Sequence, residues 1–271
     1  MATPQPMISA HEAQFARDAQ SRLFPSMRPA IPGLDYFSDW RPSAAAGGDY
    51  LDYFEMDEGD FGLAIGNVSA VGVEAALLTT SLHGIVRALR FAPKQSVAEM
   101  VGNIDELFRE IRPDNCYATL FLGRYDPVSR RLHYVNAGHE PPLVLRQNGR
   151  QHRHIRLESG GPWLGMLRRP RYREGVISLT PGDLLAAYTD GLLEAVNPHG
   201  EEWGWPRFLE CLETGPQAPT RNLVARVFTA VDEFVSGTPQ PDDMTLWLGR
   251  VEDMHVLPVV RVAEREEPVA A

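Results

Sequence analysis

The chain has 271 residues, of which 44% are apolar and 23% are charged, so it is long enough to bury a core without disulfides or a structural metal. Its 26 Lys and Arg residues against 36 Asp and Glu residues give a formal net charge of −10, which argues against a general nucleic-acid binder. The two cysteines lack zinc-ligand spacing, and no apolar stretch has the length of a membrane span or a secretory signal. We therefore expect a cytoplasmic protein that binds neither nucleic acid nor membrane.

The two ends of the chain differ from its middle. Residues 1–24 are expected to form a polar tail and a short flanking helix, because Ser9 and Glu12 have capping-box spacing. Pro25, Pro29 and Pro32 then end that helix. Residues 254–271 are charged and rich in small residues, which predicts a C-terminal tail. We expect a single folded domain over residues 25–253.

Strand-like and helix-like blocks alternate irregularly in this domain. Helices are predicted where apolar residues recur every three or four positions, and strands where short apolar runs lie between turn residues. In chain order the blocks are a strand over 61–65, helices over 72–91 and 96–112, strands over 117–125, 132–137, 143–146 and 183–189, a helix over 220–235, and a strand over 244–251. Without regular βαβ alternation, this pattern predicts α+β layers and not a doubly wound sheet.

Acidic and amide residues stand where predicted strands meet turns. Asp49 follows two glycines, Asn67 follows the apolar run 61–65, Asp190 precedes Gly191, and the pair 242–243 precedes the last strand. Carboxylates at strand ends, beside glycines that permit close backbone approach, suit hard cations. Each acid taken singly fits a turn former better than a metal ligand, since Asp-Gly is a common turn dipeptide.

Six segments, taken in order, resemble the motifs of the PPM (PP2C-like) serine/threonine phosphatases, in particular their bacterial SpoIIE/RsbU-type branch. They are AGGDYLDYF at 46–54, IGNVSAVGVEAAL at 65–77, NAGHEPPL at 136–143, GPWLG at 161–165, YTDGLLEA at 188–195 and DDMTL at 242–246. The resemblance extends from about residue 23 to residue 251, and six ordered motifs are a far more specific signal than any one of them.

This resemblance implies an α-β-β-α sandwich of two antiparallel sheets flanked by helices, with two Mn²⁺ or Mg²⁺ ions at one end of the sheets. A metal-activated water would then attack a phosphoserine or phosphothreonine, so that no side chain serves as nucleophile. By motif matching, the metal ligands are Asp49, Asn67, the Val68 carbonyl, Asp190 and Asp242. Asp52, Glu194 and Asp243 are expected to orient these ligands, and His139 is interpreted as a structural histidine at a turn.

The sequence departs from the family pattern at one ligand. The family has an aspartate that bridges both ions where this chain has Asn67, and an amide offers one neutral oxygen and no charge. One metal is therefore expected to bind weakly or to be lost. Two hypotheses remain: a phosphatase of bacterial partner-switching signalling, whose substrate resembles a phosphorylated anti-sigma-factor antagonist, or a degenerate phosphatase that binds a phosphoprotein or partner without turnover. A homodimer is consistent with either.

Overall fold

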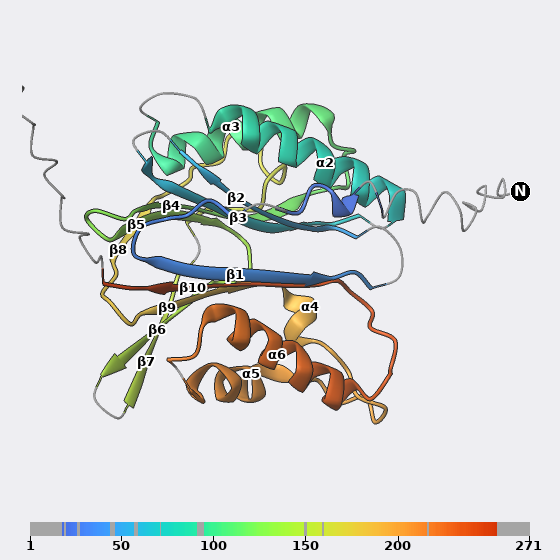
Figure 1. Ribbon diagram of the computed structural model, residues 1–271. Helices are drawn as coiled ribbons and strands as arrows, with labels where there is room; N and C mark the ends of the chain where they lie inside the picture. The colour runs from blue at the N-terminus through green and yellow to red at the C-terminus, as the bar shows by residue number, and fades with distance from the viewer. Residues whose placement is uncertain are drawn as a thin grey trace, which may run out of the picture.

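The computed structural model describes residues 18, 20–25, 28–43, 47–56, 59–70, 72–90, 95–148, 151–158, 160–215 and 217–253. Two five-stranded antiparallel sheets lie face to face, and helices cover the outer face of each (Figure 1). This four-layer arrangement is the α-β-β-α sandwich that the sequence motifs predict. The predicted N-terminal helix falls mostly on residues outside the described set, and the predicted tail over 254–271 lies wholly outside it.

The first sheet has the strand order β2-β3-β4-β5-β8 and is built largely from hairpins. Its strands are β2 (Asp49–Glu55), β3 (Phe61–Val68), β4 (Ala118–Asp126), β5 (Arg131–Ala137) and β8 (Gly175–Ser178). Two helices, α2 (Gly72–Leu89) and α3 (Val97–Ile111), connect β3 to β4. Both pack on the outer face of this sheet. The capping box predicted at Ser96 and Glu99 is confirmed at the start of α3.

The second sheet has the order β1-β10-β9-β6-β7, so the first and last described strands are neighbours. Its strands are β1 (Leu34–Arg41), β6 (Leu143–Asn148), β7 (Gln151–Arg156), β9 (Leu184–Tyr188) and β10 (Met244–Val251). Three helices, α4 (Asp190–Leu193), α5 (Gly204–Glu213) and α6 (Thr220–Val235), lie on its outer side.

Three apolar clusters hold the four layers together. One fills the space between the sheets and includes Leu51, Ile65, Phe121 and Trp247. A second lies between the first sheet and helices α2 and α3, and a third lies between the second sheet and helices α4 to α6. Because successive strand residues point to opposite faces, each central strand contributes to the inter-sheet cluster and to one helix-facing cluster.

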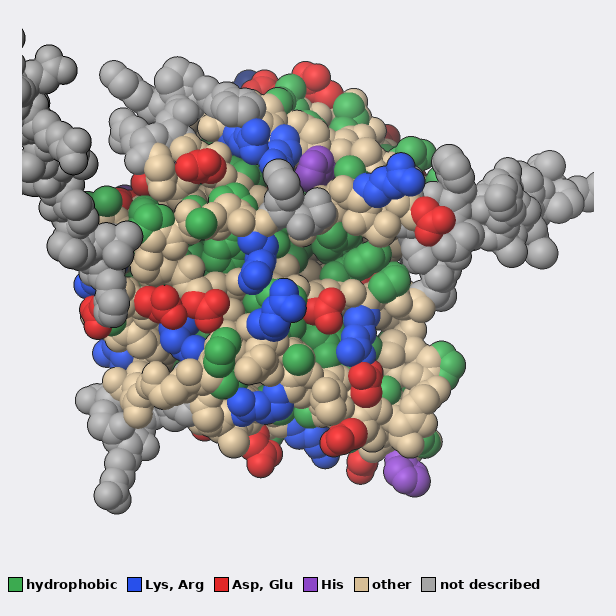
Figure 2. Space-filling model, in the orientation of Figure 1, with side chains coloured by type: hydrophobic (Ala, Val, Ile, Leu, Met, Phe, Trp, Pro, Cys, Tyr) green, Lys and Arg blue, Asp and Glu red, His purple; other side chains and the backbone are tan. Residues whose placement is uncertain are grey.

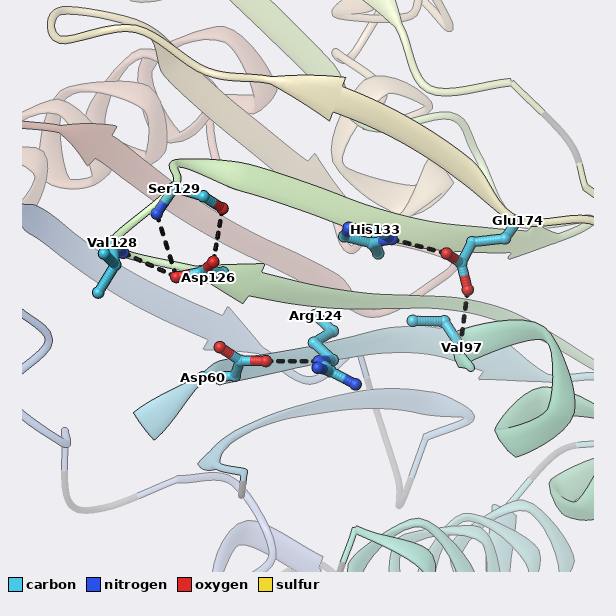
Figure 3. A network of polar contacts seen from close by, with 8 residues as sticks. All are labelled: Asp60, Val97, Arg124, Asp126, Val128, Ser129, His133 and Glu174. Atoms are coloured by element: carbon cyan, nitrogen blue, oxygen red, sulfur yellow. Dashed lines mark hydrogen bonds and ion pairs between the residues drawn. The ribbon is translucent and has the colours of Figure 1, made fainter. Parts of the chain in front are cut away.

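Polar side chains tie the first sheet to its neighbouring segments (Figure 3). Glu174, directly before β8, accepts a hydrogen bond from the backbone N–H of Val97 at 2.8 Å and lies 2.7 Å from Nδ1 of His133 on β5. Arg124 on β4 donates to Asp60 at 2.5 Å. The chain segment that precedes β8 is therefore fixed to both the sheet and the N-terminus of α3.

Every block predicted within 25–253 is present, and no end is shifted by more than three residues. The predicted strand over 61–65 is too short, because β3 continues to Val68. No strand was predicted for β1, β2, β7 or β8. In the described part of the chain, no helix combines the length and apolar character that crossing a bilayer requires.

Candidate active site

Four strand ends meet at one end of the sandwich. Asp49, at the start of β2, is the cross-strand partner of Asn67, near the end of β3. Side chains of directly opposed residues lie on the same face of a sheet, so this pair shares the inner face. In the second sheet, Tyr188 at the end of β9 pairs with Leu246 near the start of β10. Asp190 and Asp242 lie just beyond these two strand ends.

Asp49 joins the two sheets at this end. Its side chain is 1% exposed, and its Oδ2 accepts hydrogen bonds from the hydroxyls of Thr189 at 2.8 Å and Thr245 at 2.5 Å, both in or beside strands of the opposite sheet. The other oxygen, Oδ1, is buried and accepts no hydrogen bond from any described residue. Burial raises the pKa of Asp49 well above its usual value, and the neighbouring Asp243 raises it further.

The paired glycines before Asp49 make room for oxygen atoms on two sides. A Cβ on Gly48 would lie 2.4 Å from both the side-chain oxygen of Asn67 and the carbonyl oxygen of Val68. A Cβ on Gly47 would lie 1.3 Å from a carboxylate oxygen of Asp243. Only glycine is compatible with these contacts, and it brings two predicted ligand oxygens together beside Asp49.

The remaining acids interact with one another electrostatically. The pKa of Asp242 is raised by burial and then by the charges of Asp190 and Asp243. The pKa of Glu194 is raised by burial and then by Asp190, among other acids. Asp243 accepts a hydrogen bond from the backbone N–H of Ser43 at 2.8 Å. These acids therefore repel one another, and a cation among them would relieve that repulsion.

The donor set fits a divalent cation. Within the described part of the chain, no three Asp, Glu, His or Cys side chains come close enough together to form a metal site by themselves. A metal held here would therefore need the neutral oxygens of Asn67 and Val68 in addition to carboxylates. A buried carboxylate oxygen without a donor, beside further oxygen ligands, matches the preference of Mg²⁺ and Mn²⁺.

A cleft of about 680 Å³ opens at these residues. Asn67, Val68, Asp190 and Asp242 line it on the metal-ligand side. The rest of the lining includes Tyr117, Thr119, His139 and Trp163. The cleft thus combines predicted metal ligands with two aromatic side chains in one lining.

His139 occupies a tight turn beside the cleft. Its backbone N–H donates to the Asn136 side chain at 2.7 Å, and its Nδ1 lies 3.0 Å from the Thr119 hydroxyl. Burial lowers the pKa of His139 to about 4, so the ring is neutral at pH 7. This agrees with its interpretation as a structural histidine.

The predicted orienting residues separate into two groups. Asp243 and Glu194 interact with the ligand candidates as described above. Asp52, in contrast, lies three positions from Asp49 along β2 and therefore points to the opposite face, toward α2. There its carboxylate accepts two hydrogen bonds from Arg87, each of 2.5 Å.

Three threonines were not singled out from the sequence. Thr189 and Thr245 hold Asp49, and the Thr119 hydroxyl accepts a hydrogen bond from the Asn67 backbone N–H at 3.0 Å. Thr189 and Thr245 each belong to a motif that had been recognised, one residue before Asp190 and two residues after Asp243. Their closeness to these motifs is the sequence signal that could have identified the two threonines. Their contact with Asp49 gives no local signal, because Asp49 is far away along the chain.

Comparison with known proteins assigns the same family. The profile of "Stage II sporulation protein E (SpoIIE)" matches residues 57–252. Protein IcfG of Synechocystis is 27% identical over 265 residues, a match that covers 88% of this chain and 41% of IcfG. Phosphoserine phosphatase RsbP of Bacillus subtilis is 26% identical over 209 residues, covering 76% of this chain and 49% of RsbP. The chain thus spans less than half the length of these two relatives.

Solved structures share the fold. The SiaA-PP2C domain of Pseudomonas aeruginosa superposes with a TM-score of 0.76 at 21% identity, and the match covers 90% of this chain and 96% of that domain. The sandwich, the cleft at the end of its sheets and the ordered motifs agree with this similarity. The chain belongs to the SpoIIE family, in the RsbU-type branch of the PPM phosphatases, and has their PP2C fold.

Proposed function

We propose that this chain is a metal-dependent phosphatase that removes phosphate from phosphoserine or phosphothreonine in a protein of a bacterial partner-switching pathway. The observation that carries the proposal is Asp49: one carboxylate oxygen is held by two threonines of the opposite sheet, and the other is buried without a donor among the described residues. A carboxylate fixed in this way is pre-arranged to bind a cation.

Five groups would hold the metal: the carboxylates of Asp49, Asp190 and Asp242, the Asn67 side-chain oxygen and the Val68 carbonyl. Bound divalent cations would neutralise phosphoryl oxygens and lower the pKa of water. Support for metal dependence comes from the catalytic domain of the phosphatase PstP, which has been solved with two manganese ions and superposes with a TM-score of 0.57 at 14% identity.

The residues of this chain perform the positioning. Thr189 and Thr245 fix the orientation of Asp49, and Thr119 fixes the backbone at Asn67. Exposed Asp190 lines the cleft, where its carboxylate would help to hold a cation. The neutral ring of His139 adds no charge to the lining of the cleft.

Asn67 determines how strongly the metals are held. Two divalent ions carry a total charge of +4, and three ligand carboxylates would offset −3 of it. An aspartate at position 67 would add a fourth negative charge. At short range, one unit charge changes the binding free energy by up to about 4 kcal/mol at the effective dielectric constant of a protein surface. We therefore expect weakened binding of one metal and activity that requires a high metal concentration.

The proposed substrate is a phosphorylated protein of the anti-sigma-factor-antagonist type. Two relatives, RsbP and RsbU of Bacillus subtilis, are named phosphoserine phosphatases. A structural relative from Mycobacterium tuberculosis contains an RsbU and an RsbW domain. These similarities support a phosphoprotein substrate, and the open cleft of about 680 Å³ leaves room for a phosphorylated side chain.

The test is phosphate release from a phosphoserine peptide at millimolar Mn²⁺. Asp190→Asn should lower the rate by about a hundredfold or more, because it removes a ligand charge while keeping the size of the side chain. Asn67→Asp should bind Mn²⁺ about tenfold more tightly and raise the rate at low Mn²⁺. Asn222→Asp adds the same charge at an exposed position of α6 and should change neither property.

The substitution at position 67 also supports a second function, in which the domain binds a phosphoprotein without turnover. In that case neither the wild type nor Asp190→Asn releases phosphate above background, while the phosphopeptide still binds. If Asn67→Asp alters neither metal affinity nor rate, the role assigned to position 67 is wrong.

A further inference from the structure

A cluster of arginines follows the cleft residue Trp163 along the chain, in the segment Leu167-Arg168-Arg169-Pro170-Arg171-Tyr172-Arg173. All four arginine side chains of this segment are exposed. The chain as a whole has a net charge of −10, and the face shown in Figure 2 carries interspersed acidic and basic side chains. Four arginines within six residues are therefore a local exception to the acidic character of the molecule.

The backbone of this segment, and of the residues directly before it, is fixed to the domain at several points. Leu164 exchanges two hydrogen bonds with Ala118 of β4, at 2.8 and 3.1 Å. The N–H of Gly165 donates to Asp105 at 2.5 Å, and the carbonyl of Arg168 accepts from Arg109 at 2.9 Å. The N–H of Arg173 donates to Gly160 at 2.7 Å. The segment is thus held as a defined loop against α3.

The arginine side chains lack acidic partners in the part of the chain that the structure describes. None of Arg168, Arg169, Arg171 and Arg173 forms an ion pair there. The two nearest acids along the loop contacts are already engaged: Asp105 binds Arg109 and the Gly165 N–H, and Glu174 binds Val97 and His133. An ordered loop that exposes several unpaired arginines is suited to attract an acidic surface.

An apolar strip connects the arginines to the cleft. The rings of Tyr117 and Trp163 stack with centroids 4.6 Å apart, and both residues line the cleft while remaining 37% exposed. Met166 and Leu167 follow Trp163 along the chain and are 57% and 48% exposed. Aromatic residues, Met and Arg are the residue types enriched at protein interfaces, so this composition favours a protein partner.

We propose that the arginine loop (residues 167–173) and this apolar strip form a docking surface for an acidic region of the phosphoprotein substrate. The proposal rests on the proposed phosphatase function, since it places the phosphorylated residue in the cleft. Arg168 lies five positions after Trp163, which limits the distance between their Cα atoms to about 18 Å. The acidic groups of the substrate should therefore lie within about that distance of its phosphoserine.

The experiment uses two phosphoserine peptides that differ only in their flanks, Glu-rich in one and Gln-rich in the other. Their Kd values are measured by fluorescence anisotropy, and their kcat and KM by phosphate release with Mn²⁺, at low and high salt. The test variant is R168A/R169A/R171A. The matched control is R22A/R131A/R153A, which removes three exposed arginines outside this loop.

The wild type should bind the Glu-rich peptide about tenfold more tightly than the Gln-rich one at low salt, and high salt should reduce this preference. The test variant should lose the preference through Kd and KM, with kcat and the hydrolysis of p-nitrophenyl phosphate unchanged. The control variant should keep it. The docking proposal is overturned if the wild type shows no preference, or if the test variant retains it.

Failure of the two proposals can be told apart. If neither peptide nor p-nitrophenyl phosphate is hydrolysed, the phosphatase function fails, while the anisotropy measurement still tests the docking surface. If the arginines instead bind a DNA duplex more tightly than the Glu-rich peptide, the protein-docking proposal is overturned.

Discussion

The buried ion pair between Asp52 and Arg87 makes a quantitative prediction about stability. Asp52 lies on β2 with its side chain 0% exposed, and Arg87 reaches it from α2 with two hydrogen bonds of 2.5 Å. His83, also on α2, has its Nδ1 3.7 Å from the same carboxylate. Arg87→Ala therefore leaves a buried carboxylate without its cationic partner, beside only His83 and the Tyr50 hydroxyl among the described residues.

Removing one partner of a buried ion pair costs about 3–5 kcal/mol. The Arg87 side chain is 33% exposed, so water can partly replace it, and we expect the lower end of that range, about 3 kcal/mol. In a domain of this size such a loss lowers the Tm by about 6–12 °C. The double variant D52N/R87A should recover much of the loss, because no charge is then left buried.

Urea denaturation of wild type, R87A, D52N and D52N/R87A measures the free energies of the complete cycle. Arg131→Ala, at an exposed strand position, is the matched control and should change stability by less than about 0.5 kcal/mol.

Burial lowers the pKa of His83, and Arg87 lowers it further. Without Arg87 the histidine is protonated more readily, so the deficit of R87A should be smaller at pH 5 than at pH 8.

The reasoning is refuted if R87A costs less than about 1 kcal/mol, or if D52N/R87A is as unstable as R87A. The first result would mean that water solvates Asp52 in the folded state. The second would mean that Arg87 stabilises α2 by packing against Phe54 and not through the carboxylate.

Three further outcomes are expected at the cleft. His139 has a folded-state pKa of about 4, against 6.5 in the unfolded chain. The folded protein should therefore lose up to about 3 kcal/mol of stability as the pH falls from 6.5 to 4. His139→Gln should flatten this part of the pH–stability curve, measured by denaturation. Gly48→Ala should weaken Mn²⁺ binding in calorimetry, because its Cβ would displace the oxygens of Asn67 and Val68, and unchanged affinity would contradict the assigned ligands. Asp49→Asn should raise the Tm of the metal-free protein, since it removes a buried charge repelled by Asp243, and should abolish the Tm increase on adding Mn²⁺.

Three of the four strands that the sequence did not predict lack the usual strand signals. The side chains of β2 are buried on both faces from Asp49 to Phe54 and include two aspartates, so this strand shows neither alternation nor a continuous apolar run. Strand β7 reads Gln-His-Arg-His-Ile-Arg and lies at a sheet edge, and β8 has four residues. Helices α3 and α6, in contrast, bury one face with a regular period and were predicted to within a residue at each end.

The candidate site also divides into features that the sequence predicts and features that only the structure shows. Positions at predicted strand ends and the resemblance to the family motifs selected Asp49, Asn67, Asp190 and Asp242. The structure brings these strand ends to one end of the sandwich. The sequence could not show which neighbouring acid faces the cleft. The alternation of β2 turns Asp52 toward α2, while Asp49 meets the opposite sheet.

Local patterns in the sequence determined the helices, several strands and the identity of the ligand candidates, because periodicity and motif chemistry depend on nearby residues. The tertiary structure decided the contacts made by those side chains. Thr189 and Thr245 reach Asp49 across 140 and 196 positions of the chain. Such contacts depend on how two separately formed sheets pack, and that packing is set by the whole core.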